Sequence, residues 1–409
     1  MGGRCVAASR RQRSRVLVVQ IGARRRYAVP RGLAAIGSLH VLFTDACAST
    51  SPWSVLDRAL PEIVRPATLS AVLNRKIAGV ESTRVKGNLR FFLATKVGPL
   101  RRRPDEPGST YWARQNEAFG SAVAASDWGG ADSVYAYNGA ALEVFERARR
   151  TNMRCILDQT AAPWRFNSEL LDKELKRWPD WESAPSDLDS DGAMIAREEA
   201  EWKLADRIIC GSQFVVEAVR AVGGPVHKCA VVEYPVPEVD VVTVNTREAS
   251  HRALRVLFLG TLQLRKGIQY FWEAAGRLDA SCEFRAVGPS NLTKAAQELV
   301  QSRIDWRPNV ARTDVWEHYR WADVFVLPTL SEGSANACWE ALACGTSVAT
   351  TQASGLDKRL VDLIEPGSEA VVDYLLQYRA GPRRPVAPLR IRRSVKDYGS
   401  ALARAMAWA

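Results

Sequence analysis

Short runs of apolar residues alternate with longer amphipathic stretches along this 409-residue chain. Consecutive rather than alternating apolar positions indicate strands that are buried on both faces, as in a parallel sheet covered by helices. The stretches between the runs, such as residues 139–150 and 214–223, have helical spacing. The first series therefore predicts a doubly wound α/β domain. Its runs are "RVLVVQI" (15–21), "HVLFTD" (40–45), "SVYAY" (133–137), "RCILDQ" (154–159) and "DRIICGS" (206–212).

A second series of apolar runs begins at residue 255, after a proline-containing polar stretch over residues 229–251 that we interpret as a linker. We predict an N-terminal Rossmann-like domain over residues 1–235 and a C-terminal one over residues 236–385. A final helix over residues 386–409 is expected to pack back towards the first domain. Such domains would face each other across a cleft, with ligands at the carboxyl ends of the strands. The second series comprises "RVLFLG" (255–260), "EFRAVG" (283–288), "IDWRP" (304–308), "DVFVLPT" (323–329) and "TSVATT" (346–351).

Composition and charge narrow the class of protein. Hydrophobic residues make up 47% and charged residues 25% of the chain, which is an ordinary globular composition. No apolar run approaches the roughly 18 residues of a membrane span. The eight cysteines are scattered without a C-x-x-C pair, which favours reduced thiols in the cytoplasm and no zinc site. The polar stretch over residues 178–192 is typical of an exposed loop.

The net charge of +11 is concentrated in the first quarter of the chain. Residues 1–103 hold about twenty Lys and Arg against about four acidic residues, including basic runs over residues 10–15 and 101–103. Such a surface attracts an anionic partner: a phospholipid surface, a nucleic acid or a phosphorylated acceptor. The alternative is a basic surface that is simply solvated.

The stretch "SEGSANACWEALACG" (331–345) carries the first chemical signal. Gly333, Ser334 and Ala335 are small enough for the backbone to approach a ligand, and the helix that follows offers free N–H groups and a partial positive charge to a phosphate. Glu332 and Glu340 flank this phosphate site, where carboxylates suit the hydroxyls of a sugar and a ribose. The pattern indicates a nucleotide-sugar site. Alternatively, Glu332 only compensates the helix dipole and Glu340 is solvated.

A second strand–loop–helix unit, "VLFLGTLQLRKGIQYFWEAAGRL" (256–278), lies in the same half. Its strand ends at Gly260, and its loop holds the basic pair Arg265 and Lys266. A basic pair at the mouth of such a unit is placed to neutralise a diphosphate leaving group. The alternative is a surface turn with Lys266 in water.

These two stretches, together with "EEAEWKLADRIICGSQF" (198–214), resemble family 4 of the retaining GT-B glycosyltransferases, the glycosyl transferases group 1. The resemblance implies the GT-B fold, with two doubly wound Rossmann-like domains around a central cleft. It implies a hexosyltransferase-type enzyme that moves a sugar from a nucleotide-sugar donor to a glycan, lipid-linked or other acceptor with retention. It places Glu340 at the donor ribose, Glu332 at the transferred sugar, and Arg265 with Lys266 at the diphosphate. The backbone of residues 333–335 would help to bind the sugar and the phosphate.

The chain departs from the family pattern at two positions. Many members have an arginine directly after the strand glycine, where this chain has Thr261 after Gly260. Many also have a histidine at the end of an N-terminal strand, and the matching residue here is Gln159, which cannot shuttle a proton. A front-face mechanism tolerates that loss, because the departing phosphate oxygen accepts the acceptor's proton while Lys266 and Arg265 stabilise its charge. These two cations, and the lack of an Asp-x-Asp motif at a strand end, predict catalysis without a metal or another cofactor.

The loop "IGARRRYAVPRGL" (21–33) follows the first strand, so we expect it to open onto the cleft from the acceptor side. Gly22 fits a tight turn, and Arg24, Arg25 and Arg26 would line the cleft together with Gln159. This reading implies an anionic or membrane-presented acceptor, and an enzyme that is cytoplasmic or peripheral at the inner membrane face. Alternatively, the arginines point into solvent.

Two other functions stay open. A GT-B sugar-nucleotide epimerase would use the same donor half, but such enzymes rely on acid/base side chains, and the N-terminal half is poor in histidine. A non-catalytic protein on the same fold could bind nucleic acid or a membrane through its basic residues. The basic runs lack the interleaved aromatic residues of a stacking platform, so we expect no nucleic-acid partner.

Overall fold

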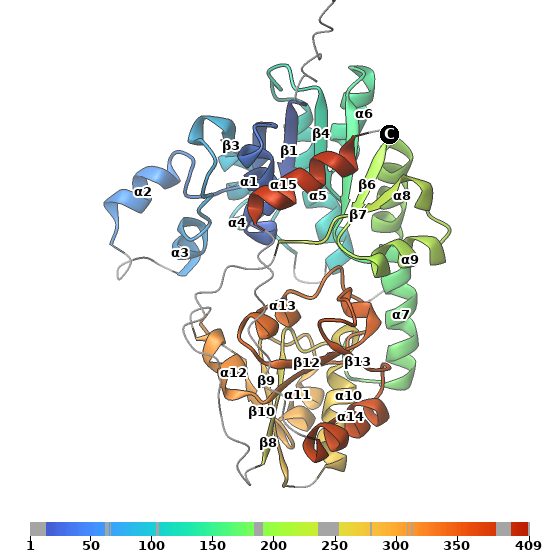
Figure 1. Ribbon diagram of the computed structural model, residues 1–409. Helices are drawn as coiled ribbons and strands as arrows, with labels where there is room; N and C mark the ends of the chain where they lie inside the picture. Colours follow the sequence, from blue (N-terminus) through green and yellow to red (C-terminus); the bar gives the residue numbers. More distant parts are fainter. Residues whose placement is uncertain are drawn as a thin grey trace, which may run out of the picture.

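The computed structural model describes residues 14–61, 65, 67–103, 106–183, 191–235, 253–278, 280–308, 310–311, 314–381 and 394–407. These residues form two α/β domains, drawn one above the other in Figure 1. Each domain is built on one sheet in which all paired strands are parallel. This confirms the predicted fold class of two doubly wound Rossmann-like domains.

The N-terminal sheet has the strand order β3-β2-β1-β4-β5-β6-β7. The chain starts in the middle of this sheet and winds outwards in both directions, as in dinucleotide-binding folds. All five predicted strands are present, whereas β3 and β7 were not predicted. The short β7 lies in the stretch that we interpreted as linker. The strands are β1 (Val16–Gln20), β2 (Leu39–Thr44), β3 (Val85–Gly87), β4 (Ser133–Tyr137), β5 (Arg154–Gln159), β6 (Arg207–Cys210) and β7 (Cys229–Val231).

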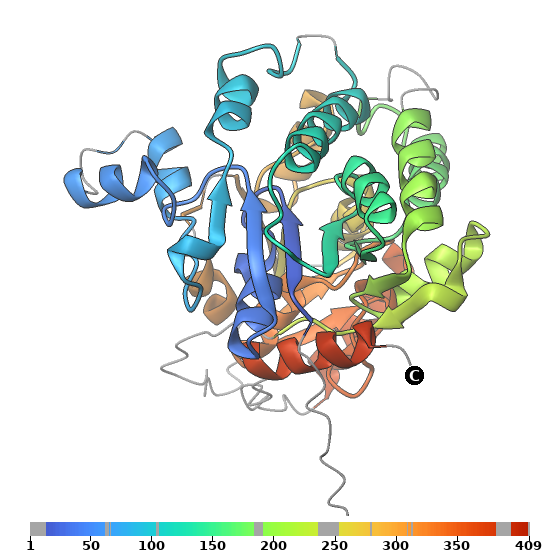
Figure 2. The same ribbon diagram turned by 90° about the horizontal axis from the view of Figure 1, so that it is seen from above.

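Helices cover both faces of this sheet (Figure 2). Apolar side chains of α4, α5, α6, α8 and α9 form one core layer, and those of α1 and α15 form the other. The described helices and short turns of this half of the sequence are η1 (Arg24–Tyr27), α1 (Ala28–Ala35), α2 (Trp53–Ala59), α3 (Ala67–Leu73), η3 (Ser82–Arg84), α4 (Leu89–Lys96), α5 (Gly108–Ala124), α6 (Leu142–Arg150), α7 (Trp164–Arg177), α8 (Gly192–Leu204), α9 (Gln213–Ala221) and η5 (Val226–Lys228).

The C-terminal sheet has the order β10-β9-β8-β11-β12-β13 and a single large apolar core. Its strands are β8 (Leu254–Leu259), β9 (Cys282–Val287), β10 (Asp305–Arg307), β11 (Val324–Leu327), β12 (Ser347–Thr350) and β13 (Asp362–Leu363). The remaining helices are η6 (Leu264–Lys266), α10 (Ile268–Arg277), α11 (Lys294–Gln301), α12 (Val315–Trp321), α13 (Asn336–Ala343), η7 (Gln352–Ser354), α14 (Ser368–Ala380) and α15 (Val395–Met406).

Helix α15 follows the C-terminal domain in sequence but lies against α1 of the N-terminal domain (Figure 1). Tyr398 and Leu402 of α15 are fully buried in the core layer next to α1. The two helices cross closely at Gly32 and Gly399. A Cβ atom on Gly399 would lie only 2.1 Å from the carbonyl oxygen of Gly32. Glycine at this crossing therefore lets the backbones meet.

Helix α7 belongs to the N-terminal half of the sequence but extends along the C-terminal domain (Figure 1). The buried Glu174 of α7 accepts hydrogen bonds from Gln269 Nε2 at 3.0 Å and from the Tyr270 hydroxyl at 2.8 Å. Beyond the helix, Trp178 and Trp181 pack their rings against Trp272 of α10. The start of the predicted exposed loop is therefore packed, and residues 184–190 of that loop lie outside the described residues.

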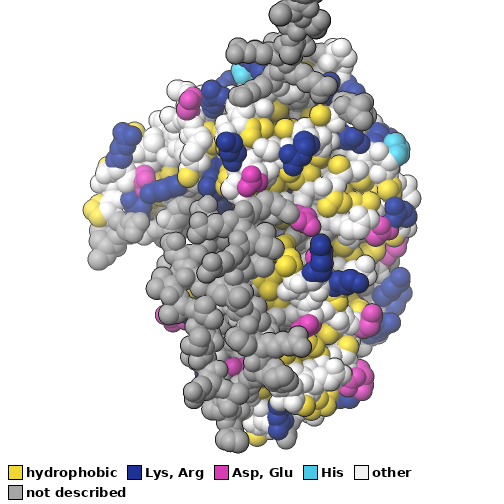
Figure 3. Space-filling model, viewed as in Figure 1, with side chains coloured by type: hydrophobic (Ala, Val, Ile, Leu, Met, Phe, Trp, Pro, Cys, Tyr) yellow, Lys and Arg dark blue, Asp and Glu magenta, His cyan; other side chains and the backbone are white. Residues whose placement is uncertain are grey.

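No helix in the described ranges combines the length and apolar character that a membrane span requires. On the face shown in Figure 3, the Lys and Arg side chains of the N-terminal domain are spread out rather than gathered in one patch. Of the predicted basic run over residues 10–15, residues 10–13 lie outside the described residues, whereas Arg101, Arg102 and Arg103 are described and exposed.

Candidate active site

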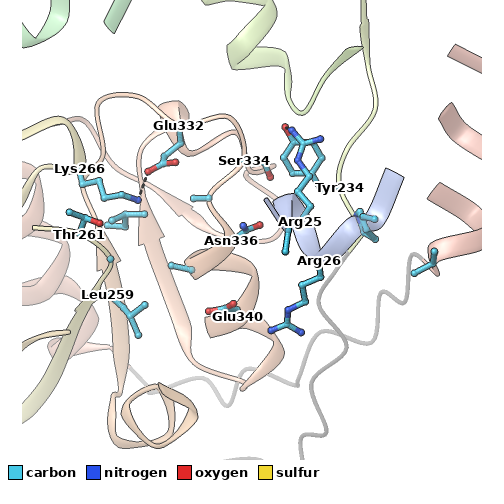
Figure 4. Close-up of a pocket in the computed structure, with 18 of the residues that line it drawn as sticks. Arg25, Arg26, Tyr234, Leu259, Thr261, Lys266, Glu332, Ser334, Asn336 and Glu340 are labelled. Carbon is cyan, nitrogen blue, oxygen red and sulfur yellow. Dashed lines mark hydrogen bonds and ion pairs between the residues drawn. The ribbon is translucent and has the colours of Figure 1, made fainter. Parts of the chain in front are cut away.

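A cavity of about 660 Å³ is lined by residues of both domains, which is the usual size of a small-molecule site. Its C-terminal wall comes from the ends of β8 and β11 and the start of α13, and its N-terminal wall from η1 and α1. The carboxyl ends of the C-terminal strands thus meet the first loop of the N-terminal domain (Figure 4). The predicted site residues that line the cavity are Gly260, Thr261, Lys266, Glu332, Ser334, Ala335, Glu340, Arg25 and Arg26.

An ion pair joins the two predicted chemical motifs inside this cavity. Lys266 Nζ lies 2.5 Å from Glu332 Oε1, and the guanidinium of Arg265 lies 3.7 Å from the same oxygen. Burial opposes the ionisation of Glu332, but the charges of Lys266 and Arg265 outweigh this effect and lower the pKa of the carboxyl. Arg265 also donates to the carbonyl oxygen of Ser331. The ionised Glu332 carboxylate therefore lies beside two cations, of which Lys266 lines the cavity and Arg265 does not.

Backbone geometry fixes Lys266 in this position. Gly267 ends the η6 turn in the left-handed region, with φ +79°, and begins α10. A Cβ atom there would lie 2.1 Å from the carbonyl oxygen of Pro328. From the α7 side, the Glu182 carboxylate accepts a hydrogen bond of 2.5 Å from the Leu264 backbone N–H. The loop is thus held both by its own domain and by the segment that follows α7.

Helix α13 starts at the cavity without a side-chain cap and without an acidic residue in its first turn. Its positive dipole end is therefore available to an anion. Ser334, just before the helix, accepts a hydrogen bond of 3.0 Å from Trp339 Nε1. Glu340 is 4% exposed and accepts a hydrogen bond of 3.1 Å from the Tyr319 hydroxyl. Figure 4 shows its carboxylate on the cavity side of the helix.

The N-terminal domain holds the loop that carries Glu332 from both sides. Ser331 Oγ lies 2.6 Å from Asn167 Oδ1, and Ser212 Oγ donates to the carbonyl oxygen of Gly333 at 2.6 Å. A Cβ atom on Gly333 would lie 1.9 Å from the carbonyl oxygen of Thr160. Gly333 thus lies in the seam between the domains, and it does not line the cavity.

The arginine loop is more ordered than the sequence indicated. Arg25, Arg26 and Tyr27 are three consecutive residues in the left-handed region, with φ of 50°, 50° and 59°. The buried guanidinium of Arg25 donates two hydrogen bonds to Asp158, at 2.9 and 3.0 Å, and lies on the Tyr234 ring. Burial disfavours its charge, but the Asp158 carboxylate raises its pKa well above the ordinary value. Arg25 therefore stays charged, and the Asp158 carboxylate balances its charge within the protein.

The other residues that we predicted for the N-terminal wall differ in whether they line the cavity. Arg24 is exposed and lies 3.5 Å from Thr160 Oγ1. Arg26 is exposed and lines the cavity. Gly22 adopts φ +71°, as its predicted turn requires, but does not line the cavity.

The placement of Gln159 in the cleft is corrected by the structure. Its side chain is fully buried, donates to Glu198 at 2.8 Å and accepts from Trp202 Nε1 at 2.9 Å. Its amide therefore joins β5 to α8 and does not face the cavity.

Sequence reasoning missed Asn336 and Tyr234, which also line the cavity, and Ser212 and Asn167, which hold its loop. Asn336 is the first residue of α13, so the predicted helix start could have indicated it. Tyr234 lies in the stretch that we interpreted as linker. No group of three or more His, Cys, Asp or Glu residues in the described ranges is arranged to hold a metal ion.

Comparisons with known proteins place these features in context. Residues 253–377 match the family model described as glycosyl transferases group 1. A D-inositol 3-phosphate glycosyltransferase of Mycobacterium bovis is 30% identical over an alignment of 204 residues, and this alignment covers 44% of this chain and 42% of that protein. The chain thus matches less than half of the length of this relative.

Solved structures match over nearly the whole chain at low identity. Sucrose-phosphate synthase from Thermosynechococcus elongatus aligns with a TM-score of 0.59 at 16% identity, covering 96% of this chain and 95% of that one. The catalytic domain of starch synthase IV from Arabidopsis thaliana, bound to ADP and acarbose, aligns with a TM-score of 0.57 at 11% identity, covering 97% and 96%. The chain therefore has the GT-B fold, and the predicted resemblance of its C-terminal half to glycosyl transferases group 1 is confirmed.

Proposed function

We propose that the protein is a glycosyltransferase that takes a hexose from a nucleotide-sugar donor and transfers it with retention of anomeric configuration. The observation that carries the proposal is the cavity in which Lys266, Glu332, Glu340 and the uncapped start of α13 come together. Lys266 supplies a cation and the helix start supplies a dipole for the diphosphate. Glu332 and Glu340 supply carboxylates for the hydroxyls of the sugar and the ribose. The match to the group 1 family model over the same residues supports this assignment.

The proposed reaction is a front-face displacement. The bond between the anomeric carbon and the diphosphate oxygen breaks, and the acceptor oxygen bonds to the same face of that carbon. The acceptor's proton passes to the departing phosphate oxygen, so no protein base is required. Lys266 and Arg265 stabilise the charge that develops on this oxygen, and neither a metal nor another cofactor takes part. The buried position of Gln159 is compatible with this scheme, because the scheme asks nothing of that residue.

For the acceptor, we propose an anionic or membrane-presented molecule that approaches along the N-terminal wall. Arg31 lines the cavity on this side, and Arg24 is exposed nearby in the same loop. The relative described above is named for transfer to an inositol phosphate, a phosphate-bearing acceptor. We propose that the enzyme works in the cytoplasm and docks reversibly on the inner face of the membrane.

The exposed surface at the end of α4 supports docking. Leu93 and Val97 are 47% and 81% exposed and lie one helical turn apart. The exposed Arg101, Arg102 and Arg103 follow shortly afterwards in the sequence. Exposed apolar side chains near a basic run suit an anionic lipid surface, where each basic residue contributes roughly 1 kcal/mol.

The test incubates the purified protein with UDP-, GDP- and ADP-sugars, with and without a cell extract as the source of acceptor. Release of nucleoside diphosphate that depends on the extract, undiminished by EDTA, is the expected result. NMR spectroscopy of the product should show the anomeric configuration of the donor. A changed sugar without any acceptor would indicate an epimerase instead. Loss of turnover with EDTA and recovery with Mg²⁺ would contradict the proposed stabilisation by side-chain cations alone.

A further inference from the structure

Arg26 differs from the other cations of the cavity, because its side chain has no partner among the described residues. Its side chain makes no ion pair or hydrogen bond with any residue in the described ranges, although it is exposed and lines the cavity. By contrast, Arg25 is bound to Asp158, and Lys266 to Glu332. An arginine that forms no ion pair with a described residue, and that lies in a ligand-sized cavity, is suited to bind an anionic group.

The neighbours of Arg26 hold it in place. On one side, Arg25 is fixed by two hydrogen bonds to Asp158 and by the Tyr234 ring. On the other side, the Tyr27 side chain is 1% exposed within the core layer. All three residues adopt left-handed backbone angles, which non-glycine residues rarely do and which cost free energy. The loop is thus held on both sides of Arg26, whose own side chain is bound to no residue in the part of the chain that the structure describes.

The direction of the side chain separates its role from that of its neighbours. In Figure 4, Arg25 points towards Tyr234, whereas Arg26 points the opposite way, on the side of Glu340. Lys266 and Glu332 lie at the other end of the group of labelled residues. Glu340 is the residue that the proposed function places at the donor ribose. Arg26 therefore lies on the nucleotide side of the cavity rather than on the side of the transferred sugar.

Part of the C-terminal wall, which faces Arg26 across the cavity, is lined by neutral residues. At the end of β8, the cavity is lined by Leu259, Gly260 and Thr261, none of which carries a charge. The start of α13 contributes Asn336 and Ala337, which are also neutral, whereas Glu332 and Glu340 are the carboxylates of this wall. A diphosphate bound there would meet a helix dipole and Lys266 from one domain, and its remaining charge would face the N-terminal wall.

We propose that Arg26 binds the diphosphate of the donor from the N-terminal domain and so completes the donor site across the cleft. This inference rests on the proposed function and deepens it. It replaces the expectation that all three arginines of the loop serve the acceptor, and it gives Arg25 the role of a positioning residue that fixes the loop.

The test measures binding of UDP, ADP and GDP by calorimetry to the wild type and to Arg26→Ala, Arg26→Lys and Arg31→Ala. For the nucleotide that the wild type binds, Arg26→Ala should weaken affinity by roughly 10- to 100-fold, the worth of a charge-assisted hydrogen bond. Arg26→Lys should retain part of the affinity. Arg31→Ala is the matched control, because Arg31 lines the same cavity but donates to the carbonyl oxygen of Ala78 at 3.2 Å; it should weaken binding much less.

A rescue variant keeps the test independent of folding. Arginine introduced by Thr261→Arg in the Arg26→Ala background places a cation on the opposite wall of the same cavity, and it should restore much of the lost affinity. Unchanged nucleotide binding in Arg26→Ala, or equal losses in Arg26→Ala and Arg31→Ala, would overturn the inference. Glu340→Ala separates this failure from that of the proposed function. If Glu340→Ala weakens binding and Arg26→Ala does not, only the role of Arg26 is wrong; if the wild type binds no nucleoside diphosphate, the proposed function is wrong too.

Discussion

The pair of Lys266 and Glu332 offers a test in which stability and turnover are expected to respond differently. Both side chains are largely buried, at 17% and 16% exposure, and their charged atoms lie 2.5 Å apart. Lys266→Ala leaves the Glu332 carboxylate with only the more distant Arg265, at 3.7 Å. Losing one hydrogen bond between charged groups costs about 1.5–3 kcal/mol. We expect the free energy of unfolding to fall by about that amount.

The double variant Lys266→Ala/Glu332→Ala removes both charges, so no unpaired carboxylate stays behind. Its free energy of unfolding should recover part of the loss, with a coupling between the two sites of about 0.5–3 kcal/mol. Turnover should not recover. If Lys266 stabilises the leaving phosphate, its loss lowers kcat by roughly 10²–10³-fold whatever stands at position 332.

The assay combines urea unfolding of the four proteins of this cycle with steady-state kinetics on the same preparations. Lys266→Arg is a useful companion, because it keeps the charge and should lose less turnover than Lys266→Ala. Recovery of turnover in the double variant would show that Lys266 acts only by neutralising Glu332. Wild-type kcat in Lys266→Ala would refute the reasoning altogether.

Three further predictions follow from the seam, the carboxylate and the basic surface. Gly333→Ala should lower the free energy of unfolding by about 1–3 kcal/mol in thermal unfolding, because the new Cβ would lie 1.9 Å from the Thr160 carbonyl oxygen. Gly108→Ala is the control and should leave stability unchanged, because no described atom lies within 4 Å of its new Cβ. The pKa of Glu332 is lowered in the folded protein, so its ionised form stabilises the fold above the ordinary glutamate pKa of about 4.3. This contribution is lost as the pH falls through the lower pKa of the folded state. The difference in the free energy of unfolding between wild type and Glu332→Gln should therefore shrink below about pH 4. Replacing Arg101–Arg103 with Gln should reduce flotation with anionic liposomes at low salt and leave turnover of a soluble acceptor unchanged; equal recovery of the wild type with neutral and anionic vesicles would contradict membrane docking.

Much of the fold could be predicted because buried parallel strands leave a direct signal. The run at β1, Val16–Gln20, is buried at every position, and such continuous apolar runs are visible without any partner. The strand–loop–helix order also placed Lys266 and Glu332 at the same edge of one sheet, and the structure brings them into one cavity. Short edge strands such as β7, Cys229–Val231, have too few residues for a pattern and were missed.

What could not be predicted depends on contacts between distant parts of the chain. Arg25 and its hydrogen-bond partner Asp158 are 133 positions apart in the sequence. Nothing in the local pattern "RRR" therefore distinguishes Arg25, whose charge is balanced by an ion pair, from its neighbours. Glu174 of α7 meets Tyr270 across 96 positions, and its helix has the spacing of any amphipathic helix. The packing of α7 on the other domain therefore had no local signal. Gln159 was expected in the cleft because it matches the family's histidine position at the end of a strand, but its side chain turns towards α8 instead.

The measurement that tests the central claim most directly is calorimetric titration of a panel of nucleotide-sugars into the wild type and Glu340→Ala. Glu340 is buried at the cavity and is held there by the Tyr319 hydroxyl at 3.1 Å. Its removal should affect the proposed ribose contact without altering the cations that we propose for the diphosphate. We predict that at least one nucleotide-sugar binds the wild type with a stoichiometry of about one, as expected for a single donor cavity. The same donor should bind Glu340→Ala more weakly by about 2–3 kcal/mol. A panel that does not bind the wild type, or that binds both proteins equally, would contradict the assignment of this cavity to a nucleotide-sugar.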